Sequence, residues 1–260
     1  MTPLLHAKIV GQGKPFLILH GLLGMGDNWI SLARRYANHG FEVHLIDLRN
    51  HGKSFHDDEM NYEAMVDDLI HYININQLQK IYLMGHSMGG KTAMFFAMQY
   101  PEKLHKLIVV DITPKKYPPH HQFIFEAIEQ IDLKKFNKRE DINQFLSKKI
   151  SSTAIRNFLL KNLKRDATGK FDWKPNIKVL KNNLNDLGEP LPPYTVFTKP
   201  VLFIKGEKSP YILANDEKLI KAHFPNSEII QIPESGHWVH AEQSEIFFNR
   251  SLTFLLNNNN

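Results

Sequence analysis

The sequence has no cysteine among its 260 residues, so disulfides, thiolate metal sites and a cysteine nucleophile are excluded. Long apolar runs are also missing, since no stretch approaches the ~20 residues that a membrane-spanning helix needs. Residues 1–8 lack the basic segment followed by an apolar one that marks a secretory signal. We therefore expect a cytoplasmic protein without stable membrane insertion.

Strong charge of one sign is absent from the chain as a whole. The formal net charge is +5, and the hydrophobic (42%) and charged (23%) fractions are those of an ordinary globular protein. The charge is unevenly placed, because residues 113–199 carry 17 Lys and Arg against 9 Asp and Glu, a net of +8. No His-Glu-x-x-His helix and no paired carboxylate spacing occur, so we expect no metal site.

Short apolar runs alternate with helical patterns, which is the signature of a sheet with parallel strands. The predicted strands are residues 16–19, 43–46, 81–84, 107–110, 201–205 and 228–232. Helices are predicted at residues 29–39, 62–75, 91–100, 215–223 and 244–256. The fold class is therefore α/β, a mostly parallel sheet flanked by helices.

Residues 113–199 interrupt this alternation. They contain amphipathic helical segments around residues 121–131, 142–148 and 152–163 and no clear strand, and prolines gather at both ends. We interpret residues 113–199 as a helical cap inserted into a core of residues 1–112 and 200–256. Residues 257–260, all asparagine, are expected to form a disordered tail.

The strongest motif is Gly85-His86-Ser87-Met88-Gly89, which lies directly between a predicted strand and a predicted helix. Gly-x-Ser-x-Gly in this setting is a nucleophile elbow. Its glycines are needed because a serine exposed on a tight turn requires the strand and the helix to approach closely. At the start of a helix, N–H groups favour developing negative charge. Ser87 is therefore the predicted nucleophile.

An oxyanion requires two hydrogen-bond donors near this serine. One donor is expected to be the N–H of Met88, the residue that follows the nucleophile. The second is expected from the loop after the strand at residues 16–19, where His20 and Gly21 begin the loop. We assign it to the N–H of Leu22, with Leu23 as the alternative.

A histidine base is selected by chain order, because in this arrangement it follows the last strand and precedes the last helix. His237 occupies that place. The acid has two candidates: Asp111, at the end of the strand after the nucleophile strand, and Glu207, in the loop after residues 201–205. In that loop Ser209 stands where an aspartate is usual, and a serine supplies a hydrogen bond but no charge. We favour Asp111.

A polar cluster at residues 47–54 follows the strand at residues 43–46. We interpret it as a structural turn in which Asp47 pairs with Arg49 and Gly52 permits the bend.

Together these residues resemble the α/β-hydrolase superfamily, and within it the YbfF-type bacterial esterases and their mitochondrial abhydrolase relatives. The resemblance covers nearly the whole chain and rests on residues 20–24, 27–28, 47–54, 85–91, 110–114, 209–211 and 236–242. It implies a triad of Ser87, His237 and Asp111, with Ser209 assisting the histidine. It also implies carboxylesterase or acyl thioesterase activity without a cofactor.

The expected function is hydrolysis of a carboxylic ester or acyl thioester through an acyl-enzyme. The expected partner is this small-molecule substrate and not a nucleic acid; the oligomeric state is not indicated. Two alternatives are carbon-carbon bond hydrolysis by the same triad, and a catalytically silent protein that binds a small ligand. A dehalogenase or epoxide hydrolase is disfavoured, because those enzymes carry an aspartate in place of Ser87.

The uneven charge gives a first prediction. If residues 113–199 steer an anionic leaving group such as coenzyme A, added salt should slow acyl-CoA hydrolysis more than hydrolysis of a neutral ester. The measurement is kcat/KM for both substrates, with the same acyl group, across a range of salt concentrations. Equal salt dependence would make the charge an ordinary solvated face.

Overall fold

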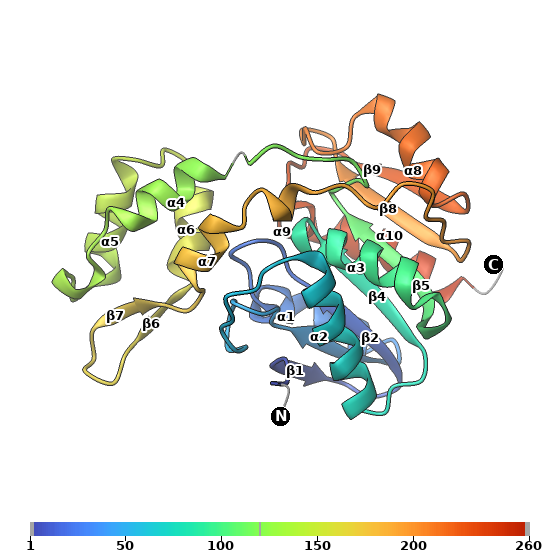
Figure 1. The fold of residues 1–260 in the computed structure, drawn as a ribbon, viewed down its shortest axis with the longest axis horizontal. Helices are drawn as coiled ribbons and strands as arrows, with labels where there is room; N and C mark the ends of the chain where they lie inside the picture. The colour runs from blue at the N-terminus through green and yellow to red at the C-terminus, as the bar shows by residue number, and fades with distance from the viewer. Residues whose placement is uncertain (1–2, 120, 258–260) are drawn as a thin grey trace.

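The computed structural model describes residues 3–119 and 121–257. A seven-stranded sheet in the order β1-β3-β2-β4-β5-β8-β9 forms its centre (Figure 1). The strands are β1 (Ala7–Val10), β2 (Lys14–Leu19), β3 (Phe41–Ile46), β4 (Ile81–His86), β5 (Leu104–Val110), β8 (Val201–Gly206) and β9 (Ser227–Ile232). All neighbours pair in parallel except β1, which runs antiparallel to β3. The predicted α/β fold with a mostly parallel sheet is confirmed.

The burial of each strand explains whether it could be predicted from the sequence. All six residues of β4 are buried, as expected of a central strand covered on both faces. β1 was not predicted, because this edge strand has no buried residue and therefore no apolar run.

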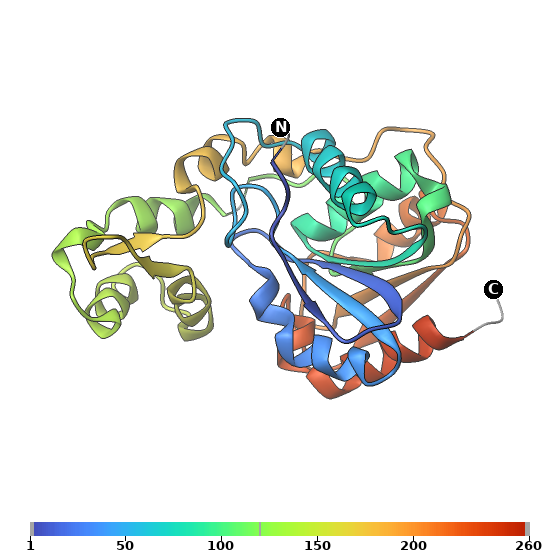
Figure 2. The ribbon, with the colours of Figure 1, turned by 90° about the horizontal axis from the view of Figure 1, so that it is seen from below.

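Helices cover both faces of the sheet, as Figure 2 shows. On one face lie α1 (Ile30–Ala37) and α10 (Ser244–Leu256), and on the other α2 (Tyr62–Ile75), α3 (Met88–Gln99) and α8 (Glu217–His223). Each face buries its own hydrophobic cluster. Full burial of one such apolar side chain contributes about 1.5–3 kcal/mol, so the two clusters hold the helices against the sheet.

A long segment separates β5 from β8 and lies beside the sheet (Figure 1). It contains α4 (Gln122–Glu129), α5 (Arg139–Ser147), α6 (Thr153–Leu160), β6 (Leu163–Arg165), β7 (Phe171–Trp173) and α7 (Ile177–Asn182). We call residues 113–199 the inserted segment.

The expectation that the inserted segment has no strand was wrong, because β6 and β7 form an antiparallel hairpin. Each strand has only three residues, too few for an alternating pattern to be recognised. The turn between them is closed by Asp166, whose Oδ1 accepts from the N–H groups of Thr168 and Lys170, and Gly169 has a φ of +78°. A left-handed conformation of this kind favours glycine.

The two ends of the inserted segment are bound to each other and to α3. Lys91 is only 1% exposed, and its Nζ donates to the carbonyl oxygen of Lys115, at 2.7 Å, and to that of Glu189. Tyr117 N–H also donates to Gly188 O, at 2.8 Å. Burial lowers the pKa of Lys91 to about 7, and its amino group joins both ends of the inserted segment to the helix that follows the elbow.

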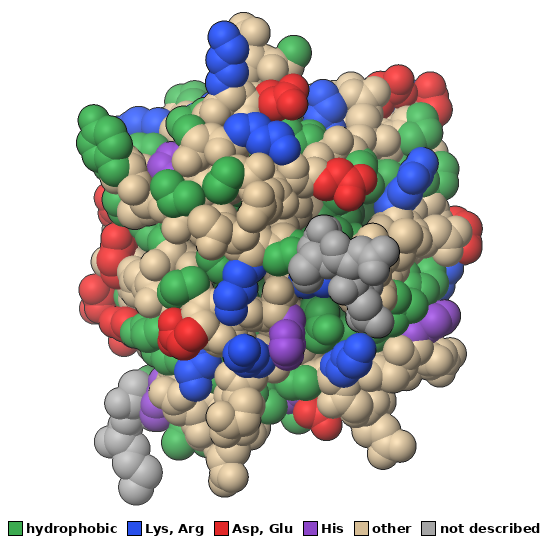
Figure 3. All heavy atoms as spheres, turned by 90° about the vertical axis from the view of Figure 1, so that its right-hand side faces the viewer, with side chains coloured by type: hydrophobic (Ala, Val, Ile, Leu, Met, Phe, Trp, Pro, Cys, Tyr) green, Lys and Arg blue, Asp and Glu red, His purple; other side chains and the backbone are tan. Residues whose placement is uncertain are grey.

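Two further sequence expectations concern membrane insertion and the C-terminal tail. None of the helices in residues 3–119 and 121–257 is both long and apolar enough to cross a membrane. On the face turned away from the inserted segment, acidic and basic side chains are interspersed with isolated hydrophobic ones (Figure 3). Of the predicted disordered tail, residues 258–260 lie outside the described residues.

Replacement of Lys91 by methionine should reduce stability. Lys91→Met keeps the apolar stem but leaves two carbonyl groups without their donor, and each such loss costs about 1–3 kcal/mol. We expect the free energy of unfolding to fall by about 2–4 kcal/mol in urea denaturation followed by circular dichroism. Lys178→Met, at an exposed position in the same segment, is the control and should change it by less than about 0.5 kcal/mol. Equal effects of the two changes would contradict the assigned role of Lys91.

Candidate active site

Ser87 lies between the last residue of β4 and the first residue of α3. Its φ of +52° is rare for a residue with a side chain and is a source of local strain. The neighbouring glycines permit it, because a Cβ at Gly85 would lie 2.1 Å from Gly89 O, and one at Gly89 would lie 2.6 Å from Leu19 O. The predicted strand, turn and helix are therefore present, and the close approach explains the glycines.

The imidazole of His237 is bound to a buried carboxylate. Its Nδ1 lies 2.6 Å from Oδ2 of Asp111, which is fully buried at the end of β5. The Gly206 N–H donates to the other oxygen, Oδ1, at 3.2 Å. Burial raises the pKa of Asp111 to about 6, and the hydrogen bonds from Ser209 and Gly206 oppose that rise. This carboxyl group lies beside the histidine that sequence order selected.

Glu207 and Ser209, in the loop after β8, lie differently from each other. Glu207 is exposed, and its Oε2 accepts from the N–H of Glu234 at 2.8 Å. The Ser209 hydroxyl donates to Oδ2 of Asp111. Ser209 therefore contacts the same carboxylate oxygen that His237 contacts, and its expected assistance to the histidine stays a prediction.

The loop after β2 carries the predicted oxyanion donor. Leu22 and Met88 line a small cavity together with Ser87. The alternative donor is already engaged, since Leu23 N–H donates to Nε2 of His51 at 3.1 Å. Of the two loop residues considered, Leu22 is thus the one whose N–H remains suited to an oxyanion.

Two buried histidines fix this loop to the turn at residues 47–54 through contacts that no local pattern predicts. Nε2 of His51 accepts from the Leu23 N–H in the loop, and Nε2 of His20 accepts from the Leu48 N–H in the turn at 3.0 Å. The Nδ1 atoms donate to Arg49 O and Gly21 O, respectively. Burial lowers the pKa of His20 to about 4 and that of His51 to about 3, so both rings are neutral and each can donate and accept.

His86 links the nucleophile turn to the loop after β9, because its Nε2 donates to His237 O at 2.9 Å. Burial lowers its pKa to about 3, which keeps it neutral. Behind it His240 stacks on Trp29 with 3.9 Å between ring centroids. Neither contact follows from local sequence, because each joins residues that are distant along the chain.

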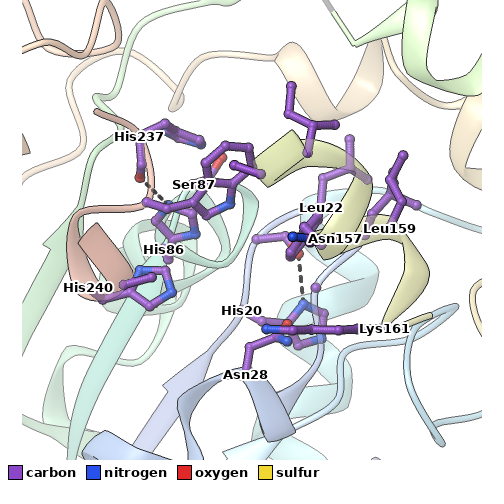
Figure 4. A pocket seen from close by; sticks show the side chains of 18 of the residues that line it. His20, Leu22, Asn28, His86, Ser87, Asn157, Leu159, Lys161, His237 and His240 are labelled. Carbon is purple, nitrogen blue, oxygen red and sulfur yellow. Dashed lines mark hydrogen bonds between the residues drawn. The ribbon is translucent and has the colours of Figure 1, made fainter. Parts of the chain in front are cut away.

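Ser87 and His237 face a cavity of about 570 Å³ between the sheet and the inserted segment (Figure 4). In Figure 4, His237, Ser87 and His86 gather on one side of it, with Asn28 and Lys161 at another. The inserted segment supplies apolar lining from Ile124, Ile155, Phe158 and Leu159. The predicted nucleophile, a histidine with its carboxylate and a largely apolar cavity are thus brought together.

Several known proteins are similar to this chain in sequence and in fold. A family model described as alpha/beta hydrolase fold matches residues 14–143. The chain is 36% identical over 254 residues to a Danio rerio protein named sn-1-specific diacylglycerol lipase ABHD11, which covers 94% of this chain and 79% of that protein. The chain belongs to the α/β-hydrolase fold family. The family resemblance noted in the sequence is therefore confirmed.

Other members of the α/β-hydrolase family are similar over almost the full length. Esterase YbfF of Escherichia coli is 32% identical over 237 residues, or 90% of each chain. A solved structure described as a marine microorganism esterase is 42% identical, with a TM-score of 0.95 over 97% of this chain and all of that one.

One expected pair at the edge of this α/β-hydrolase site is wrong. Arg49 binds Asp68 of α2 through two hydrogen bonds of 2.6 and 2.9 Å, and not Asp47. Asp47 instead accepts from the N–H groups of Gly26 and Lys53. A carboxylate that organises a turn binds nearby N–H groups, whereas the guanidinium finds a bidentate partner 19 residues away. Gly52 does adopt a left-handed φ of +58°.

Substitution of the three residues near the imidazole should separate their roles. Asp111→Asn removes the charge that stabilises an imidazolium, a change that costs ~10⁴ in turnover in a well-studied serine protease. We expect a loss in kcat of at least ~10³ for Asp111→Asn, of less than about tenfold for Glu207→Gln, and of an intermediate size for Ser209→Ala. Steady-state kinetics at pH 8 would measure this order. A crippled Glu207→Gln enzyme beside an active Asp111→Asn enzyme would assign the acid to Glu207.

Proposed function

We propose that this protein hydrolyses a carboxylic ester or acyl thioester through an acyl-enzyme, with Ser87 as nucleophile, His237 as base and Asp111 as acid. The observation that carries the proposal is the 2.6 Å contact between His237 Nδ1 and the buried Asp111 carboxylate, in a cavity that Ser87 also lines. A buried carboxylate on one nitrogen of an imidazole leaves the other nitrogen as a proton acceptor.

The reaction follows from these positions. Because Nδ1–H donates to Asp111, Nε2 of neutral His237 takes the hydroxyl proton of Ser87 as its oxygen attacks the acyl carbon. The resulting oxyanion accepts from the N–H groups of Leu22 and Met88. The bond to the leaving oxygen or sulfur then breaks, and the imidazolium returns the proton to that atom. A water molecule repeats the sequence and releases the carboxylic acid and free Ser87.

The relatives support ester cleavage, because those named above are described as a lipase and esterases. The solved esterase, at 42% identity over nearly the whole chain, gives the strongest support of this kind. The inserted segment supports the proposal as well, since it contributes apolar side chains to the cavity beside Ser87 as a cap would. The descriptions of these relatives do not extend to an acyl-enzyme, a thioester substrate or a triad, which we propose from the positions of the residues.

Labelling of the serine tests this function directly. A fluorophosphonate probe should label the wild-type protein, and Ser87→Ala should abolish labelling and reduce turnover of a short-chain aryl ester by a factor on the order of 10⁵ to 10⁶. Ser147→Ala, at an exposed serine of the inserted segment, is the matched control and should leave labelling intact. Absence of labelling in the wild type would favour a silent binding protein. Turnover by Ser87→Ala within tenfold of wild type would refute the nucleophile.

A further inference from the structure

Two cavities of very different size meet at Ser87. The larger, of about 570 Å³, is lined by Ser87 and His237. The smaller, of about 50 Å³, is lined by Ser87 and Met88, and its described lining does not include His237. A substrate cleaved at Ser87 has two parts, an acyl group and a leaving group, so the question is which cavity receives which part.

The position of His237 decides the direction of the leaving group. Nδ1 faces Asp111, so Nε2 must return the proton to the leaving atom. The leaving oxygen or sulfur therefore faces the imidazole, and the remainder of the leaving group extends into the cavity that His237 lines. Tyr211 reinforces this separation, because its ring stacks on the imidazole at 4.0 Å while it also lines the smaller cavity. It thus stands between His237 and that space.

The acyl chain takes the remaining direction. In the tetrahedral intermediate the acyl carbon carries the Ser87 oxygen, the oxyanion, the leaving atom and the acyl chain. The oxyanion is held by Leu22, which lines both cavities, and by Met88, which lines the smaller one, while the leaving atom faces the larger cavity. The fourth substituent is therefore directed to the smaller cavity, whose walls include apolar side chains from Ile112, Leu184 and Leu187.

We propose that the 50 Å³ cavity is the acyl subsite and admits only short acyl groups, whereas the 570 Å³ cavity accepts a large alcohol or thiol. This inference rests on the proposed function. One water-sized group needs about 10–15 Å³ of such space, so the smaller cavity holds about three to five non-hydrogen atoms. Acyl groups from acetyl to butyryl fit that size. An octanoyl chain does not fit.

Leu187 lies at a useful place in the wall of the acyl subsite. It is half-buried on the inserted segment, and its backbone carbonyl accepts from the Tyr62 hydroxyl at 2.6 Å. Substitution of its side chain alters the space but keeps that hydrogen bond. Ile155 is the matched control, because it is also a half-buried aliphatic residue of the inserted segment but lines only the larger cavity.

The experiment measures kcat/KM for two series of esters. In the first, the leaving group is fixed and the acyl group lengthens from acetyl to hexadecanoyl; in the second, the acetyl group is fixed and the alcohol lengthens. We expect the wild type to lose at least about tenfold from butyryl to octanoyl esters, since a hydrophobic pocket discriminates by about tenfold or more for a misfitting methylene. Across the alcohol series, values should stay within about tenfold.

Each variant should change the dependence of kcat/KM on only one of the two chain lengths, that of the acyl group or that of the alcohol. Leu187→Ala should shift the acyl optimum to longer chains, and Leu187→Phe should confine it to acetyl esters. Ile155→Phe should alter the alcohol profile and leave the ratio of octanoyl to butyryl hydrolysis unchanged.

Outcomes against the inference are distinct from outcomes against the function. Efficient hydrolysis of octanoyl and longer esters by the wild type, abolished in Ser87→Ala, would overturn the acyl subsite and keep the serine hydrolase. A response of the acyl profile to Ile155→Phe and not to the Leu187 variants would reverse the two subsites. Failure of the wild type to hydrolyse any ester in either series would instead refute the proposed function.

Discussion

The hydrogen bond between Asp111 and His237 is the interaction on which the site depends. The Asp111 carboxylate is fully buried and exchanges its hydration for donors from three places in the chain: His237, Gly206 and Ser209. Such a group is stable in the interior only when these partners are present together. The strand order provides them, because β5 and β8 are neighbours and the loop after β9 lies next to β8. The sheet therefore positions the charge, and the charge positions the base.

The sequence predicted what local chemistry determines. Ser87 could be found because its glycines and its flanking strand and helix are adjacent in the chain, and His237 because chain order restricts the choice. The sequence favoured Asp111 over Glu207, but the contact of Asp111 with His237 depends on the juxtaposition of strand ends, which no local pattern encodes. The same reason hid the pairing of Arg49 with Asp68, since the two residues belong to separate elements.

Backbone strain is concentrated at the carboxyl edge of the sheet. Leu23, Asn50, Ser87 and Asp111 all have positive φ values without being glycine. Buried contacts hold these segments; for example, the neutral His20 and His51 bind the loop after β2 to the turn at residues 47–54. Conformations that cost on the order of 1–3 kcal/mol each persist where the surroundings fix them.

The attachment of the inserted segment through Lys91 has a consequence for how such enzymes diversify. Lys91 lies one helical turn after Ser87, and its hydrogen bonds to the two ends of the segment are made to backbone carbonyls, with the ring of Tyr117 5.5 Å away. Almost any sequence supplies carbonyl groups, so the anchor makes few demands on composition as long as the chain leaves and returns at the same two points. New helices between those points can reshape the specificity of the enzyme while the nucleophile keeps its geometry. Evolution or a protein engineer can thus exchange the interior of the segment and retain its two ends.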